Sequence, residues 1–200
     1  MTEPHLSTNP SAGTSSFHDA VARHLQACEG FSTVVAAVGG RWSSPSPCPG
    51  WDARGVVEHV IGFHDVLLLR PLWLKPHRLK SDPLLRWTVT VDAIALALQE
   101  AGGPIVLAVP GNANMNIARL LPMLTTDVLV HSWDLSAAVG APPSVDPELA
   151  ARAYEEAAGR DLASLQTSGM FGPSIPVGDD ADPVTKLVAL LGRDPDWRAP

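Results

Sequence analysis

The chain has 200 residues, of which 46% are apolar and 18% are charged, and its formal net charge is -7. This length is typical of one domain, and the apolar fraction argues against global disorder. An acidic chain without a cluster of lysine and arginine is poorly suited to nucleic acid. No apolar run approaches the roughly 20 residues that cross a bilayer, and the first residues lack the pattern of a secretory signal. We therefore expect a cytoplasmic protein that binds neither nucleic acid nor membrane.

The first part of the chain predicts an N-terminal arm followed by a helix. Residues 1–15 are rich in Ser, Thr, Pro and Gly and are expected to be a disordered arm, which leaves residues 16–200 as a single domain. From Phe17 to about Val38, apolar residues recur at spacings of three and four, which is one face of a helix. The segment 41–52, RWSSPSPCPGWD, contains three prolines and is expected to be a rigid loop.

Two further helices are expected before the middle of the chain. The second begins near Asp52, a good N-cap residue, and runs to about Leu69. The third spans Asp82 to Ala101, and the glycines at 102 and 103 end it. The run IVLAV that follows favours β-structure, but we expect an extended connector because too few strands are present for a sheet.

The C-terminal half predicts one long helix and two shorter ones. A continuous apolar stripe runs from Ile117 to Gly140, and Pro122 should kink this helix or mark its true start. A fifth helix is expected from Pro147 to about Leu165, and a short one over 182–191. Four amphipathic helices with short or proline-rich connections predict an all-α helical bundle with additional C-terminal helices.

A pair of polar residues on the fourth helix could bind a metal. Asp127 and His131 are four residues apart, so their side chains lie on one face of the helix. The same spacing occurs in surface ion pairs and does not by itself identify a site. Here, however, Leu124, Val128 and Leu135 bracket the pair on the apolar stripe. A carboxylate and an imidazole that face a core need partners, and a cation is one.

A third ligand would come from another helix. His59 lies on the inward side of the second helix, whereas His64 points roughly 140° away around it and is a poorer candidate that is not excluded. His18 and His24 flank the apolar face of the first helix and are expected at the surface. Two imidazoles and one carboxylate with an open position resemble a catalytic zinc site, although nickel and iron(II) suit the same ligands.

The motifs SPCPGWDARGVVEHVIG and DVLVHSWDLSAAVG together resemble the DinB-like metal-binding bundles. More closely, they are similar to the actinobacterial branch related to mycothiol-dependent maleylpyruvate isomerase, and the predominance of arginine over lysine suits such a source. The resemblance implies a DinB-like four-helix bundle whose divalent metal, zinc above all, is held by His59, Asp127 and His131. It also implies mycothiol as a co-substrate.

The chain departs from the isomerase in two respects. Asp127 stands where the isomerase has a glutamate, and its side chain is one methylene shorter. The isomerase also has a separate C-terminal domain that contributes to its active site, whereas only about sixty residues follow Gly140 here. The second substrate of the isomerase is therefore not carried over. The resemblance leaves a homodimer open, since relatives of this fold are often dimers.

Other residues near the motifs have two interpretations each. Asp134, three residues after His131, is expected either to orient a ligand or bound substrate, as a catalytic carboxylate behind the metal, or to pair with an arginine. Trp51 is expected to act as a hydrophobic staple or core anchor and Asp52 to cap a helix, and the alternative for both is a direct ligand role. Cys28 and Cys48 are too few for a disulfide framework, and each is expected to be a buried or an indifferent thiol. The arginines that could meet an anionic substrate are Arg54, Arg70, Arg86 and Arg119.

The sequence predicts a metal enzyme that uses mycothiol in the transfer or isomerisation of a small electrophilic molecule. The metal would lower the pKa of the thiol, and the thiolate would attack an electrophilic carbon. Two alternatives stay open. One is a metal-dependent hydrolase in which water replaces the thiol. The other is a non-catalytic metal-binding or stress-response bundle.

Overall fold

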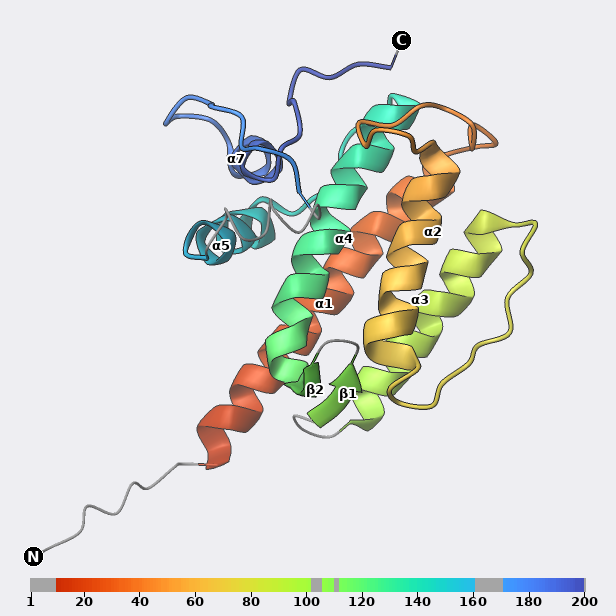
Figure 1. The fold of residues 1–200 in the computed structure, drawn as a ribbon, viewed down its shortest axis with the longest axis vertical. Coiled ribbons are helices and arrows are strands. Elements are labelled where there is room, and N and C mark those ends of the chain that lie inside the picture. Colours follow the sequence, from red (N-terminus) through yellow and green to blue (C-terminus); the bar gives the residue numbers. More distant parts are fainter. Residues whose placement is uncertain (1–9, 102–105, 110–111, 161–170, 200) are drawn as a thin grey trace, which may run out of the picture.

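Four helices form the bundle in the computed structural model, which describes residues 10–101, 106–109, 112–160 and 171–199 (Figure 1). They are α1 (Pro10–Ala37), α2 (Ala53–His64), α3 (Pro83–Glu100) and α4 (Ile117–Val139). Contacts join α1 to α4, α4 to α2, α2 to α3 and α3 to α1, so the four helices close a ring. As Figure 1 shows, α1 and α4 run in one direction and α2 and α3 in the other. The predicted all-α bundle is confirmed.

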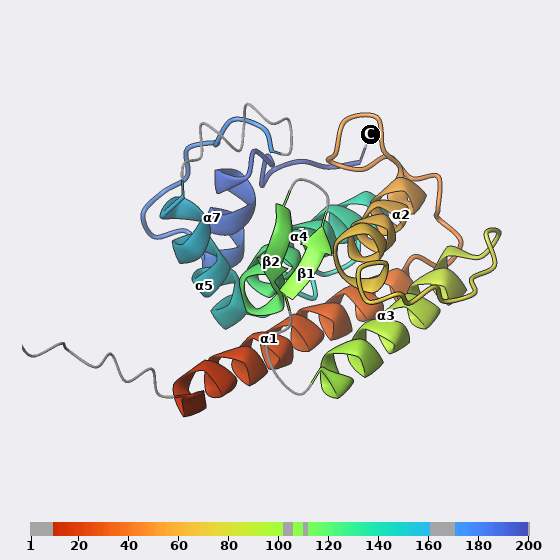
Figure 2. The ribbon, with the colours of Figure 1, turned by 60° about the horizontal axis from the view of Figure 1, so that its bottom comes forward.

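Two shorter helices pack on the outside of the bundle. Helices α5 (Pro147–Ala158) and α7 (Pro183–Leu190) contact each other, and both contact α4 (Figures 1 and 2). These are the additional C-terminal helices that the sequence predicts. Helix α5 ends at Ala158, earlier than the expected end near residue 165, and residues 161–170 lie outside the described residues.

Aspartate side chains start four of the helices. Asp52 accepts a hydrogen bond from the backbone N–H of Gly55 at 2.8 Å, which confirms it as the N-cap of α2. Asp82, Asp146 and Asp182 cap α3, α5 and α7 in the same way. Because α3, α5 and α7 each have a proline directly after the cap, where no N–H is needed, the starts of these three helices are strongly defined.

The N-terminal helix is longer than expected. Helix α1 begins at Pro10, so residues 10–15, which we assigned to the disordered arm, are helical, while residues 1–9 lie outside the described residues. A proline is well tolerated in the first turn, and the small residues that follow it do not prevent the helix from extending. The expected end near Val38 is confirmed.

A β-hairpin replaces the expected extended connector. Strand β1 (Val106–Val109) pairs antiparallel with β2 (Asn112–Asn116), and the pair lies beside the N-terminal end of α4 (Figure 2). The prediction of a connector was wrong because β1 needs only one partner strand, and β2 is that partner. The polar sequence of β2, NANMN, lacks the alternation of apolar and polar residues by which a strand is recognised. The glycines at 102 and 103, expected to end α3, lie outside the described residues.

The helical segment that begins with α2 continues beyond His64 with a different geometry. After His64 the backbone widens into a π-helix, η1 (Asp65–Leu69), which includes a hydrogen bond from the N–H of Arg70 to the carbonyl of Asp65 at 2.9 Å. The predicted end near Leu69 is confirmed. Pro122 lies inside α4, which begins at Ile117 behind the N-cap Asn116, so this proline does not mark the start of the helix.

The core consists of two hydrophobic clusters. The first contains Val34 of α1, Val60 of α2 and Val128 of α4, and it reaches α5 and α7. The second contains Phe17 of α1 and Leu121 of α4, together with η1 and the second half of α3. Across the described ranges, none of the helices combines the length and apolar character that crossing a bilayer requires.

Candidate metal centre and its cavity

Helices α2 and α4 bring the three predicted metal ligands together. The Nε2 atom of His59 lies 3.3 Å from Oδ1 of Asp127, and the Nε2 atom of His131 lies 3.5 Å from the same oxygen. One ligand atom from each of the three residues lies within 4.8 Å of the others. Although aspartate is a methylene shorter than glutamate, it reaches both imidazoles here.

Asp127 is a buried carboxylate with an incomplete set of partners. Only 7% of the residue is exposed, and among the described residues its Oδ2 atom has no hydrogen-bond partner. Burial alone would raise the pKa of Asp127, but the neighbouring His131 and His59 outweigh it and hold this pKa below its usual range. The carboxylate is therefore ionised and still has a free oxygen.

Asp134 sits behind His131 and fixes its orientation. This fully buried carboxylate accepts a hydrogen bond from Nδ1 of His131 at 2.8 Å. Because a neutral imidazole that donates from Nδ1 has its lone pair on Nε2, the neutral form of His131 directs that lone pair towards Asp127 and His59. Asp134 is also paired with Arg193, whose Nη2 lies 3.1 Å from its Oδ2. Both contacts expected of Asp134, to the histidine and to an arginine, are thus present.

The two aspartates determine the charge of His131. Burial lowers the pKa of His131, but hydrogen bonds and charge from Asp127 and Asp134 raise it well above its ordinary value. For Asp134, burial raises the pKa, and the contacts with His131 and Arg193 lower it by more. Without a cation, His131 is therefore an imidazolium between two carboxylates. A bound cation would take the place of its Nε2 proton.

The three residues line a cavity of about 750 Å³. Cys48 and Arg193 add polar groups to the three candidate ligands, whereas Trp51, Phe63 and further side chains make the remaining lining apolar. The lining residues come from the loop before α2, from α2 and α4, and from two C-terminal segments: Pro47, Cys48, Pro49, Trp51, His59, Phe63, Met123, Asp127, His131, Phe171, Gly172, Pro173, Gly192 and Arg193. This volume lies in the range of small-molecule sites.

The proline-rich loop before α2 forms the rim of the cavity. Ser46 holds the loop closed, because its N–H and its hydroxyl both donate to the carbonyl of Trp51, at 3.1 and 3.0 Å. The segment is a loop, as expected, and these hydrogen bonds hold its two ends together. Trp51, however, is 37% exposed, and its ring centroid lies 4.7 Å from that of His59. The expectation that Trp51 anchors the core was wrong, since the loop turns this side chain towards the cavity.

Two polar residues of the site were not predicted. The thiol of Cys48 donates to Oδ2 of Asp134 at 3.1 Å, so this cysteine has a defined position in the site. Arg193 stacks near Phe171, with 5.9 Å between its guanidinium carbon and the ring centroid. None of the four arginines considered from the sequence lines the cavity. Both missed residues lie on loops, where no periodicity indicates the direction of a side chain.

The other histidines of the first two helices follow the predictions only in part. His18 is exposed, as expected. His24 is fully buried, so its expected place at the surface was wrong. The spacing of four between His24 and Cys28 is a helical signal that could have placed them together. His64 points away from Asp127 and His131, as the helical angle predicts, and is also fully buried.

Comparisons with known proteins give one family and two relatives. Residues 24–73 match the family described as "Mycothiol maleylpyruvate isomerase N-terminal domain". "Uncharacterized protein MT0763" and "Uncharacterized protein Rv0738", from two strains of Mycobacterium tuberculosis, are each 30% identical to this chain over 192 residues. Each alignment covers 88% of this chain and 98% of the relative. No solved structure matches the chain.

Proposed function

Because the chain belongs to the family of the mycothiol maleylpyruvate isomerase N-terminal domain, we propose that it is a divalent-metal enzyme that uses mycothiol. The reaction would be the isomerisation of a small electrophilic molecule or the transfer of the thiol to it. The observation that carries the proposal is the meeting of two imidazoles and one carboxylate at the wall of a cavity of about 750 Å³.

The donor set fits a divalent cation. His59, Asp127 and His131 would hold it, and the unpartnered Oδ2 atom of Asp127 is what a cation would satisfy. Three protein ligands leave a position open, as in catalytic zinc sites. The same ligands also suit nickel and iron(II), and zinc is the metal we propose first. When bound, the cation would lower the pKa of a thiol at its open position, so that a thiolate is available at neutral pH.

The protein's own residues would orient the metal ligands and bind the substrate. Asp134 holds the Nδ1 proton of His131 and keeps the Nε2 lone pair directed at the site. The apolar wall made by Trp51, Phe63 and neighbouring side chains would bind the carbon skeleton of the substrate and exclude water from the thiolate. These contacts support a thiol reaction over hydrolysis, for which water must reach the metal.

Metal content tests the ligands. We expect protein purified without added metal or a histidine tag to contain about one equivalent of a divalent cation, and His131→Ala to lose it. His77→Ala is the matched control because His77 is exposed on the loop between η1 and α3. Wild-type protein that neither contains nor takes up a divalent cation would exclude this metal mechanism. Equal metal content in His131→Ala would exclude the assigned ligands.

Thiol binding tests the co-substrate separately. Titration calorimetry with mycothiol should show binding to the zinc-loaded protein and none to zinc-treated His131→Ala. Glutathione serves as the comparison thiol. Turnover of a conjugated cis-alkene would then require mycothiol. Hydrolysis of esters or amides without thiol would favour the hydrolase. A metal-loaded protein that binds no thiol and converts neither class of substrate would support a non-catalytic bundle.

A further inference from the structure

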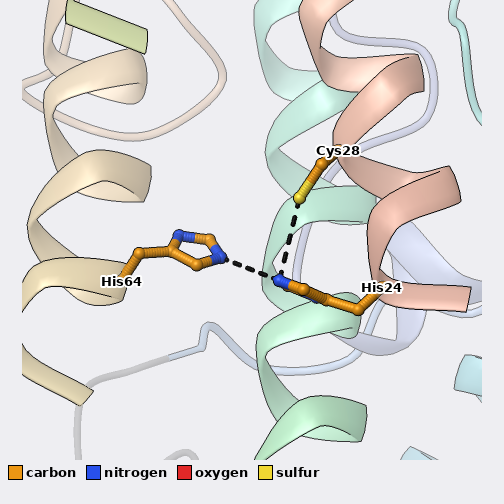
Figure 3. Close-up of side chains that lie close together, drawn as sticks. All are labelled: His24, Cys28 and His64. Carbon is orange, nitrogen blue, oxygen red and sulfur yellow. Dashed lines mark hydrogen bonds between the residues drawn. The ribbon is translucent and has the colours of Figure 1, made fainter. Parts of the chain in front are cut away.

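A second group of potential metal ligands lies inside the bundle, away from the cavity. His24 and Cys28 of α1 face His64 of α2, and all three residues are 0% exposed (Figure 3). None of them is among the residues that line the cavity. Their ligand atoms all lie within 4.8 Å of one another. Three polar side chains that converge in a sealed core require an explanation, since each costs free energy to bury.

The spacing of these atoms matches that of ligands around one cation. The two Nε2 atoms of His24 and His64 lie 3.2 Å apart, and the sulfur of Cys28 lies 3.7 Å from Nε2 of His24. Metal–nitrogen bonds of about 2.0 Å and metal–sulfur bonds of about 2.3 Å place two nitrogens roughly 3.3–3.5 Å apart and a nitrogen and a sulfur roughly 3.5–3.7 Å apart. Two of the three distances therefore match, and the third, between the ligand atoms of Cys28 and His64, lies within 4.8 Å, so binding an ion would move these two side chains closer by at most about 1 Å.

The hydrogen bonds on the far side of each ring are compatible with Nε2 atoms that carry no proton. The carbonyl of Val60 can only accept, so His64 donates to it from Nδ1 at 2.7 Å. Nδ1 of His24 lies 3.2 Å from the hydroxyl oxygen of Thr125, which accepts from His24 when its own proton is donated to the carbonyl of Leu121 at 2.8 Å. In that tautomer the lone pairs on the two Nε2 atoms face each other across 3.2 Å, and a cation can bind both.

The surroundings of the two rings are apolar, and the backbone beside them is unusual. Burial, followed by the neighbouring His64, lowers the pKa of His24 well below its ordinary value, and burial also lowers the pKa of His64. The π-helix that starts directly after His64 is a further sign, because such widened turns are frequent at functional sites.

We propose that His24, Cys28 and His64 form a second metal site that binds Cu(I) through one thiolate and two neutral imidazoles. Thiolate and imidazole are ligands that Cu(I) accepts, and three ligands complete a trigonal site. The thiolate cancels the single charge of Cu(I), so a neutral group is buried. A divalent ion would leave one positive charge in an apolar core. Cys28 releases its proton to solvent on binding, and because the site is sealed, the ion must enter during folding.

Copper binding to a single-cysteine variant tests this site. Cys48→Ser leaves Cys28 as the only cysteine of the chain, so any thiolate bound to copper must come from Cys28. The variant is refolded anaerobically with Cu(I), and X-ray absorption at the copper edge should show one sulfur and two nitrogen neighbours. Competition with a chromogenic Cu(I) chelator should give about one tightly bound equivalent. Cys28→Ser, with Cys48 retained, should bind Cu(I) at least about 100-fold more weakly.

Three results would overturn the proposal. The first is a Cys48→Ser protein whose bound copper has no sulfur neighbour. This test uses that variant alone and does not depend on whether Cys28→Ser folds. The second is Cu(I) affinity in Cys28→Ser equal to that of Cys48→Ser. The third is refolded protein that excludes Cu(I) but retains Zn²⁺ with a sulfur neighbour. Protein that binds no metal at all overturns the proposal as well, and the Thr125 hydroxyl then donates to His24 while His24 donates to His64 from Nε2.

Discussion

The substitution Asp134→Asn should weaken the protein and its metal site together. Asp134 is fully buried and makes three contacts, with His131, Cys48 and Arg193. Asparagine has the same shape but no charge, so it can accept from His131 and leaves the guanidinium of Arg193 without its counter-charge. An arginine in such a position is costly, because its charge is largely removed from water.

The expected loss follows from these contacts. Breaking a buried ion pair by removing one partner costs about 3–5 kcal/mol, and we expect the lower value because asparagine keeps one hydrogen bond. For a chain of 200 residues each kcal/mol lowers Tm by about 2–4 °C, so Tm should fall by about 6–12 °C. Zinc affinity should fall about 10–100-fold, because the ring of His131 is no longer fixed by a carboxylate.

The matched control is Asp182→Asn, the same change at an exposed carboxylate that caps α7. Asparagine is as good an N-cap as aspartate, so this variant should lose less than about 0.5 kcal/mol. Thermal unfolding followed by circular dichroism compares the two proteins. The pKa of Asp134 is lower in the folded protein than in the unfolded chain, so its contribution to stability is fully present above the unfolded pKa of about 3.9 and is lost as the pH falls through the folded pKa. The difference in Tm between wild type and Asp134→Asn should therefore narrow progressively below about pH 4. Equal Tm values for the two variants at neutral pH would refute the reasoning.

Two further predictions concern the core and the cavity wall. Because the pKa values of His24 and His64 are lowered, the unfolded chain takes up more protons below about pH 6.5, so the free energy of unfolding of the metal-free protein should fall from about pH 6.5 to 5. The raised pKa of His131 acts chiefly above this range, and a flat urea midpoint across it would contradict the prediction. Gly192→Ala should destabilise the protein by more than about 1 kcal/mol, because Gly192 has a φ of +82° and an added Cβ would lie 2.6 Å from the Cα of Gly172. An unchanged Tm would show that these two backbones can move apart.

Helices were predictable where an N-cap residue and the helical spacing of apolar residues agreed. Asp52 and Asp82 marked helix starts, and the apolar spacing of α4 gave both its length and its buried face. The same spacing placed Asp127 and His131 side by side and turned His59 towards them. The prediction failed for segments with a single signal, such as the first strand of the hairpin, whose apolar run was recognised but whose partner strand was not.

The wall of the cavity could not be predicted, because it is assembled from loops. Cys48 and Arg193 are far apart in the sequence, yet both contact Asp134. Nothing in the local sequence around Arg193 indicates this contact, which depends on how α5 and α7 pack against α4. His24 failed for a different reason. Its position beside the apolar face of the first helix argued for the surface, but His24 is buried in contact with His64 and Thr125, which the spacing within one helix does not show.

The buried polar residues also fix how the helices of the bundle are aligned. On α1, His24 separates the apolar residues of the two core clusters, and His64 on α2 and Thr125 on α4 do the same. Sliding one helix by a turn, about 5.4 Å, would keep leucine and valine packed but would bury an imidazole against them without a partner. An all-apolar core would tolerate such shifts. The polar layer therefore distinguishes one alignment of α1, α2 and α4 from its near neighbours, whether or not an ion is bound.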